Sequence, residues 1–256
     1  MAGSVILACE MMEDEVRLAL EAVALGERPP LVWVESGLHD RPDRLREALQ
    51  RLIDLLDEGA LAGSPVGLPS LRPGNGPAAE RREDVLVGPV SEVVLALGFC
   101  GKGLEGLVAR RLSLVFPRVD DCISLFLNHG CPREDIARDP RSYYLTKGWL
   151  SHDSSVKQAF VDWTAQYGEE RAASLRKAMF QGYERVTLID TQAYDVADCL
   201  DQSQAYADEL QLDHVIVPGS TQLLERLFRG ERGSEIIAVP PGEPIGFLHL
   251  FKTDET

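Results

Sequence analysis

The sequence lacks the features that mark membrane-spanning and secreted proteins. No apolar run among its 256 residues is long enough to cross a bilayer. The first ten residues contain neither lysine nor arginine and lead into an acidic stretch, which is unlike a secretory signal peptide. We therefore expect a cytoplasmic protein with no membrane partner.

Positive charge is also scarce. The chain has 26 lysines and arginines against 41 aspartates and glutamates, so its formal net charge at pH 7 is −15. Such a balance repels phosphate backbones and anionic surfaces, so nucleic acid is not an expected partner. Apolar residues make up 45% of the chain and charged residues 26%, proportions typical of a soluble protein with a sizeable core.

Cysteine is sparse, with five residues at wide spacing. An odd, scattered set of this kind does not predict a framework of disulfides in the cytoplasm. Cytoplasmic cysteines that are not core filler tend to be metal ligands or nucleophiles, so their positions indicate where a functional site lies.

Apolar strand patterns alternate with amphipathic helical patterns along the chain. Strands are predicted at residues 4–8, 31–34, 93–97, 113–116, 143–146, 186–189, 215–217 and 236–239. Helices are predicted at residues 13–25, 42–56, 104–110, 155–167, 170–180, 198–210 and 221–229. The alternation predicts an α/β fold, a parallel sheet with helices on both faces, in two similar Rossmann-like halves at 1–140 and 141–256. A stretch rich in glycine, proline and serine at 59–77 is interpreted as a flexible insertion, either a lid or a passive surface loop.

Four side chains that can bind a metal each follow one of the first four predicted strands: Cys9, His39, Cys100 and Cys122. In doubly wound sheets these positions converge outside the carboxyl ends of the strands. Three thiolates and an imidazole suit a tetrahedral zinc ion, whereas three thiolates alone suit an iron–sulfur cluster with one iron open to substrate. The sequence leaves both open, and Cys9 and Cys122 have a simpler interpretation as small buried hydrophobes.

A metal-free alternative makes Cys100 a nucleophile. In this hypothesis a helix N-terminus beside Lys102 lowers the pKa of the thiol, and His39 acts as the base. Glu10 is a candidate acid or base, or a partner that orients His39, and its simpler interpretation is a charge at a helix start.

Two further groups are candidates for substrate binding. Arg118, next to Asp120, has the fork geometry that holds a carboxylate, although an Arg–Asp pair that braces the loop is an equally good interpretation. Tyr144, Thr146 and Trp149 are placed to wall a ligand crevice between the halves, or to pack the halves together. We expect a small-molecule substrate, while the reaction and the oligomeric state are not given by these patterns.

Several stretches together resemble one protein family, catalogued as domain of unknown function 1638. They are Cys9-Glu10 and residues 37–42, 98–101, 117–122, 144–146, 183–186, 188–191 and 240–243. The resemblance implies a cytoplasmic protein often encoded near corrinoid-dependent methyltransferases, and hence a role in one-carbon, methylamine or sulfur metabolism. A metal-dependent transferase or lyase fits that setting. An accessory protein that carries a metal or small ligand to a corrinoid methyltransferase system fits it as well.

Overall fold

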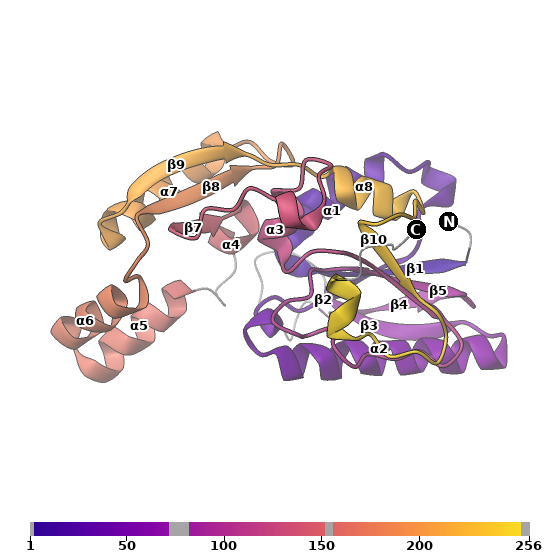
Figure 1. Cartoon of the computed structure of the whole chain (residues 1–256). Helices are drawn as coiled ribbons and strands as arrows, with labels where there is room; N and C mark the ends of the chain where they lie inside the picture. The colour runs from indigo at the N-terminus through magenta and orange to yellow at the C-terminus, as the bar shows by residue number, and fades with distance from the viewer. Residues whose placement is uncertain (1–2, 72–81, 152–155, 252–256) are drawn as a thin grey trace.

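The larger sheet of the computed structural model, which describes residues 3–71, 82–151 and 156–251, has five strands (Figure 1). Its strand order is β10-β6-β5-β1-β2, and all neighbours are parallel except the antiparallel pair β10 and β6. The strands are β1 (Ser4–Cys9), β2 (Leu31–Val34), β5 (Glu92–Ala96), β6 (Ser113–Pro117) and β10 (Ile236–Val239). The predicted α/β class is confirmed, and the sheet that was predicted to be parallel is mostly so, with β10 antiparallel at its edge.

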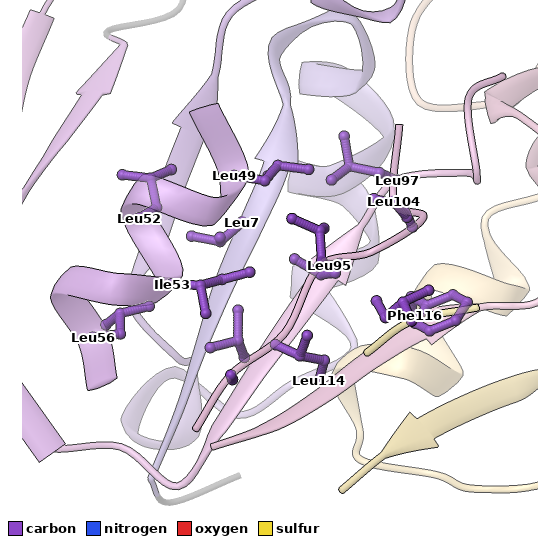
Figure 2. Close-up of a cluster of buried hydrophobic side chains, with 14 of the residues drawn as sticks. Leu7, Leu49, Leu52, Ile53, Leu56, Leu95, Leu97, Leu104, Leu114 and Phe116 are labelled. Carbon is purple, nitrogen blue, oxygen red and sulfur yellow. The ribbon is translucent and has the colours of Figure 1, made fainter. Parts of the chain in front are cut away.

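Helices cover both faces of this sheet. They are α1 (Glu13–Glu21), α2 (Pro42–Ala62) and α8 (Gln222–Phe228). Leu49 and Ile53 of α2 pack with Leu7 of β1 on one face (Figure 2). Ile6 of β1 packs with Val16 of α1 on the other face. Successive strand residues therefore enter opposite cores, and this is why β1 is a continuous apolar run rather than an alternating one.

The stretch interpreted as an insertion is partly regular structure, which corrects that part of the prediction. Residues 59–62 complete α2, and β3 (Val66–Leu71) pairs antiparallel with β4 (Arg82–Val87). Ser70 Oγ accepts a hydrogen bond of 2.7 Å from the backbone N–H of Trp33. This contact ties the hairpin to β2. Residues 72–77 of the predicted insertion lie outside the described residues.

The helix predicted at residues 104–110 is wrong. Residues 101–106 form turns, and the chain between β5 and β6 runs without a helix. Leu104 and Leu107 are nevertheless buried in the core, which explains the helix-like spacing of apolar residues. The side chain of Gln50 on α2 donates to Val108 O at 2.8 Å and accepts from Val108 N at 3.1 Å. Side chains of α2 thus replace the backbone hydrogen bonds that a helix would have made.

A second, smaller parallel sheet has the order β7-β8-β9. Its strands are β7 (Ser142–Leu145), β8 (Arg185–Asp190) and β9 (Asp213–Pro218), and its helices are α4 (Lys147–Ser151), α5 (Val156–Tyr167), α6 (Glu169–Met179) and α7 (Ala197–Leu210). The two sheets differ in size, and β10 and α8 return from the second half of the chain to the first sheet (Figure 1). Residues 1–140 therefore do not form the first sheet alone, and the division at 140 stays a prediction. Within the described ranges no helix has the length and apolar character needed to cross a bilayer.

A candidate cysteine and histidine site

Cys9, His39, Cys100 and Cys122 line one small cavity of about 20 Å³ at the carboxyl ends of the first sheet's strands. We call it the thiol pocket. The rest of its wall is mostly apolar, with Met11, Met12, Leu45, Leu97 and Gly98, and it contains one acidic residue, Glu35. The structure thus brings together four side chains that lie up to 113 positions apart in the sequence.

Backbone contacts hold the loops of Cys100 and Cys122 side by side. The N–H of Phe99 donates to Val119 O at 3.0 Å, and the N–H of Cys100 donates to Asp120 O at 2.8 Å. A Cβ on Gly98 would overlap the backbone of Asp121, so only glycine permits this approach. Cys122 then begins the short helix α3 (Cys122–Phe126).

The backbone at Cys100 is strained. Cys100, Gly101 and Lys102 follow one another with φ angles of 45°, 58° and 80°. Residues with a Cβ seldom adopt this left-handed region, and such positions cluster at functional sites. The strained run turns the chain immediately after β5 and leaves the Cys100 side chain in the wall of the thiol pocket.

Electrostatics keep the three thiols protonated at neutral pH. Burial raises the pKa of Cys9 to about 12 and the pKa values of Cys100 and Cys122 further above their usual range. Cys122 and Cys9 each raise the pKa of Cys100 as neighbouring groups, in addition to burial. The interaction with Trp149 opposes the rise at Cys122. The neutral thiol is therefore the favoured form of all three cysteines in this pocket.

The imidazole of His39 has a buried nitrogen without a hydrogen bond. Its Nε2 has no hydrogen-bond partner among the described residues, and Asp40 Oδ1 lies 3.4 Å away without the geometry of a hydrogen bond. The His39 ring meets the edge of Trp149, with the ring centroids 5.3 Å apart. An unpartnered nitrogen in an apolar wall is costly unless something binds it.

As the side chains stand, no group of three or more His, Cys, Asp or Glu residues in the described part of the chain is arranged to hold a metal ion. The four side chains of the thiol pocket share a cavity without pointing at one common centre. Binding of an ion there would need their side-chain torsions to change.

A second cavity, of about 290 Å³, adjoins the thiol pocket and shares His39, Cys100 and Cys122 with it. We call it the outer cavity. Its opposite wall comes from the second sheet and its loops: Arg138, Ser142, Tyr143, Tyr144, Trp149 and Tyr183. Gly148 lets α4 pack directly on the backbone of Met11, since a Cβ there would overlap the Met11 carbonyl. Both sheets therefore contribute to the outer cavity.

A family model described as "Protein of unknown function (DUF1638)" matches residues 78–228, which is more than half of the chain. The chain belongs to this family. Neither the curated proteins nor the solved structures that were compared with it give a match. The matched part of this DUF1638 protein includes Cys100, Cys122 and the second sheet, whereas Cys9 and His39 precede it.

Two residues predicted to bind substrate in this DUF1638 protein lie elsewhere. Arg118 is buried, and its guanidinium donates to Leu250 O at 2.9 Å and to Ser234 O at 3.4 Å. Asp120 is exposed and pairs with Arg133. Neither residue lines the thiol pocket or the outer cavity. The reason is β10, which adds to the sheet beside β6 and brings the C-terminal segment over Arg118.

Of the other predicted site residues, two line the outer cavity and two are buried outside both cavities. Tyr144 and Trp149 line the outer cavity, whereas Thr146 is buried outside it. Glu10 is buried, and its Oε2 accepts from the backbone N–H of Ser36 at 3.3 Å, which ties the end of β1 to the loop before His39. Glu10 therefore supports the His39 loop and does not line either cavity.

The features that would activate Cys100 as a metal-free nucleophile differ from the prediction. The residues after Cys100 form turns, so no helix N-terminus lies beside the thiol. Lys102 is exposed and lies 3.8 Å from Glu105, a partner on the same loop. With its pKa raised by burial, the Cys100 thiol is a weak nucleophile at neutral pH.

Sequence reasoning missed Arg138 and Tyr183 as cavity residues. Arg138 lies in an irregular loop before Pro140, and no motif distinguishes it from the neighbouring arginines. Tyr183 belongs to a stretch that resembles the family, but only the pairing of β7 with β8 places it near Tyr143, with the ring centroids 5.7 Å apart.

Proposed function

We propose that this DUF1638 protein binds one thiophilic metal ion, zinc first of all, through Cys9, Cys100, Cys122 and His39, and acts on a small molecule in the outer cavity. The observation that carries the proposal is that three thiols and an unpartnered imidazole nitrogen line one apolar pocket. Three sulfurs and one nitrogen form a common donor set for zinc.

The electrostatics of the pocket support a cation. The thiols resist ionisation because they are buried and because they neighbour one another. A bound divalent ion reverses this, since a coordinating thiol is deprotonated outright. The same ion would satisfy the buried Nε2 of His39.

The size of the pocket favours a single ion over an iron–sulfur cluster. A cavity of about 20 Å³ holds roughly one water molecule. A cluster of several irons and sulfides would need the loops after β1 and β5 to move apart, and the contact of Gly98 with Asp121 opposes that movement at Cys100.

The outer cavity supports a role in catalysis rather than in stability alone, because it reaches Cys100, Cys122 and His39 from the solvent side. A metal-dependent transferase or lyase of one-carbon or sulfur metabolism is the reaction class we propose, in line with the family resemblance. In the accessory alternative, the same ligands hold an ion or small molecule for delivery to a corrinoid methyltransferase system. Co-purification with that system and no turnover in isolation would select the alternative.

Metal analysis tests the proposal. Protein purified without oxygen is expected to contain about one zinc per chain and to be colourless. Serine at Cys9, Cys100 or Cys122 should each remove the zinc. Cys131→Ser is the matched control, since Cys131 is also a free, half-buried cysteine but lines neither cavity. If the protein contains iron and sulfide instead of zinc, the site holds an iron–sulfur cluster. If none of the three substitutions changes the metal content, the proposal is wrong.

A further inference from the structure

We infer that the outer cavity binds a small organic acid, with its carboxylate on Arg138 and its other end against the thiol pocket. The inference deepens the proposed function and rests on it for the chemistry at the thiol end. It transfers to Arg138 the carboxylate-binding role that the sequence suggested for Arg118.

Arg138 has donors to spare. Its Nη1 donates to Asp121 Oδ2 at 2.7 Å and to Ser124 Oγ at 3.2 Å. Its Nε and Nη2 make no hydrogen bond within the described ranges, and its side chain keeps 40% of its surface exposed. The guanidinium carbon lies 5.9 Å from the centre of the Tyr144 ring, and this cation–π contact helps to orient the guanidinium group. Two free N–H groups on one planar fork fit a carboxylate.

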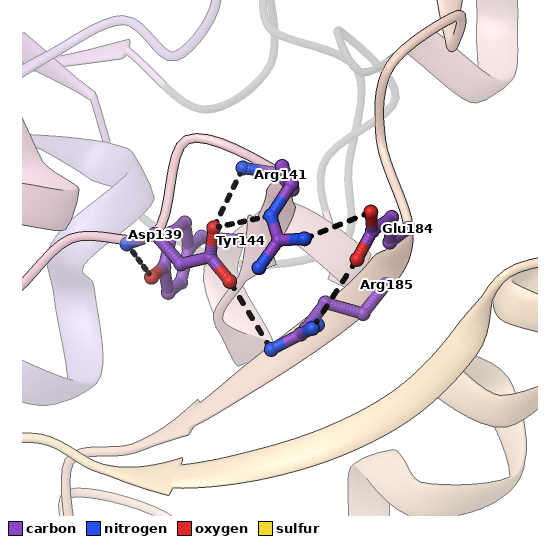
Figure 3. A network of polar contacts seen from close by, with 5 residues as sticks. All are labelled: Asp139, Arg141, Tyr144, Glu184 and Arg185. Carbon is purple, nitrogen blue, oxygen red and sulfur yellow. Dashed lines mark hydrogen bonds and ion pairs between the residues drawn. The ribbon is translucent and has the colours of Figure 1, made fainter.

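The loop that carries Arg138 is anchored on the second sheet (Figure 3). The N–H of Asp139 donates to the Tyr144 hydroxyl at 2.9 Å, and Asp139 Oδ2 lies 3.1 Å from Arg185 Nη1. Arg141 pairs with Glu184 at 2.9 Å in the same network. These contacts fix the backbone next to Arg138, which lowers the ordering cost of ligand binding.

The charges that line the outer cavity favour an anion over a cation. The carboxylate of Asp121 is already used, because Oδ1 accepts from the N–H of Ser124 at 2.8 Å and Oδ2 accepts from Arg138. The groups that can serve a ligand include the donor capacity of Arg138, the indole N–H of Trp149 and an imidazole nitrogen of His39. Among the described residues that line the outer cavity, Asp121 is the only one with a carboxylate.

Size and wall composition limit the ligand further. A volume of about 290 Å³ lies at the lower end of ligand-pocket volumes, which are roughly 300–1,000 Å³, and therefore favours a small acid. Tyr143, Trp149 and Tyr183 give the middle of the cavity an aromatic wall. A short apolar body with one carboxylate matches this surface.

Two matched probes test the inference: 3-mercaptopropionate and 3-mercapto-1-propanol, which have thiols of equal reach and differ in the carboxylate. By calorimetry, wild-type protein is expected to bind the acid about tenfold more tightly than the alcohol, which corresponds to about 1.4 kcal/mol. Arg138→Met should abolish this preference, and Arg138→Lys should retain part of it. Arg226→Met is the control, because Arg226 forms an ion pair with Glu231 at similar exposure on α8, away from the cavity.

Each titration is carried out with and without zinc, and zinc content is measured in every variant. An acid preference that survives in Arg138→Met, or equal binding of the two probes by wild type, overturns the inference. Absence of any binding of the acid at millimolar concentration also overturns it. Absence of zinc binding overturns only the proposed function, because the preference due to Arg138 is expected without metal as well.

Discussion

Glu15 provides a quantitative test of how the two sheets are joined. This α1 residue is 1% exposed, and its Oε1 accepts a hydrogen bond of 3.0 Å from Thr191 Oγ1, directly after β8. Burial raises the pKa of Glu15 from 4.5 to about 7, although the hydrogen bond from Thr191 opposes the rise. The carboxyl group is therefore a pH-sensitive contact between the first sheet's helix layer and the second sheet.

The sign follows from the two pKa values. Below pH 4.5 Glu15 is protonated in both the folded and the unfolded state. The folded protein then buries a neutral carboxyl group, and the free energy of unfolding carries no penalty for a buried charge. Between 4.5 and about 7 the folded state keeps the proton and the unfolded state loses it, so the free energy of unfolding falls as pH rises. The gap between 4.5 and about 7, at about 1.36 kcal/mol per pKa unit, corresponds to about 3 kcal/mol.

Glu15→Gln removes this titration and keeps an amide oxygen that can accept from Thr191. Urea unfolding of wild type and variant from pH 4.5 to pH 8.5 is the assay. The stability of the variant relative to wild type should rise by about 3 kcal/mol across that window. Glu21→Gln, at the exposed end of the same helix, is the control, with a difference from wild type that stays constant. Parallel curves for Glu15→Gln and wild type would refute the reasoning.

Three further predictions concern the thiol pocket and its surroundings. Gly98→Ala is expected to cost about 2 kcal/mol of stability or more and to abolish zinc binding, because a Cβ there overlaps the Asp121 backbone. Gly88→Ala, where a Cβ meets open space, is the control for urea unfolding and zinc titration; equal behaviour of the two variants would contradict the prediction. Zinc affinity is expected to rise with pH, since thiols with raised pKa values must lose protons on binding. Competition with a chelator measures this, and a flat profile argues against thiolate ligands. Arg118→Met should lower stability by about 2 kcal/mol, because two backbone carbonyls lose a charged donor. The acid preference should stay as in wild type, and its loss would place Arg118 back in the binding site.

Much of the fold follows from local patterns, and the failures have local causes. Strands form at all eight predicted positions, because each is a short apolar run bounded by turn residues. The helix expected at 104–110 failed because Leu104 and Leu107 reach the core from turns instead. Gly103 and Gly106 in that stretch were the available warning: a Cβ on Gly103 would press on Leu45, and Gly106 has a φ of 87°. Strand β3 was missed because glycine and proline in residues 59–77 indicated a loop, whereas β4 lies beyond that stretch, in residues for which no element was predicted.

Some residues of the candidate site could be placed from the sequence, and others could not. The position of a residue at the end of a parallel strand is a backbone property, so the sequence could place Cys9, Cys100 and Cys122 at one edge, and they share a cavity. The direction of a long side chain depends on what packs over it. Arg118 turned toward the C-terminal segment, which lies 132 positions later in the chain at Leu250. Arg138 entered the outer cavity through a loop without a regular pattern.

The geometry around Cys100 fits the proposed metal ligand better than a nucleophile. A nucleophilic cysteine needs its thiolate stabilised in the absence of substrate, by a helix N-terminus, a cation or an imidazolium. Cys100 has turns instead of a helix, and the two neighbouring thiols raise its pKa further. Its left-handed backbone costs of order 1–3 kcal/mol, and strain of this kind clusters at functional sites. Clustered sulfur and an unpartnered imidazole nitrogen favour the proposed metal ion, because an ion would replace the thiol protons and would give His39 Nε2 a partner.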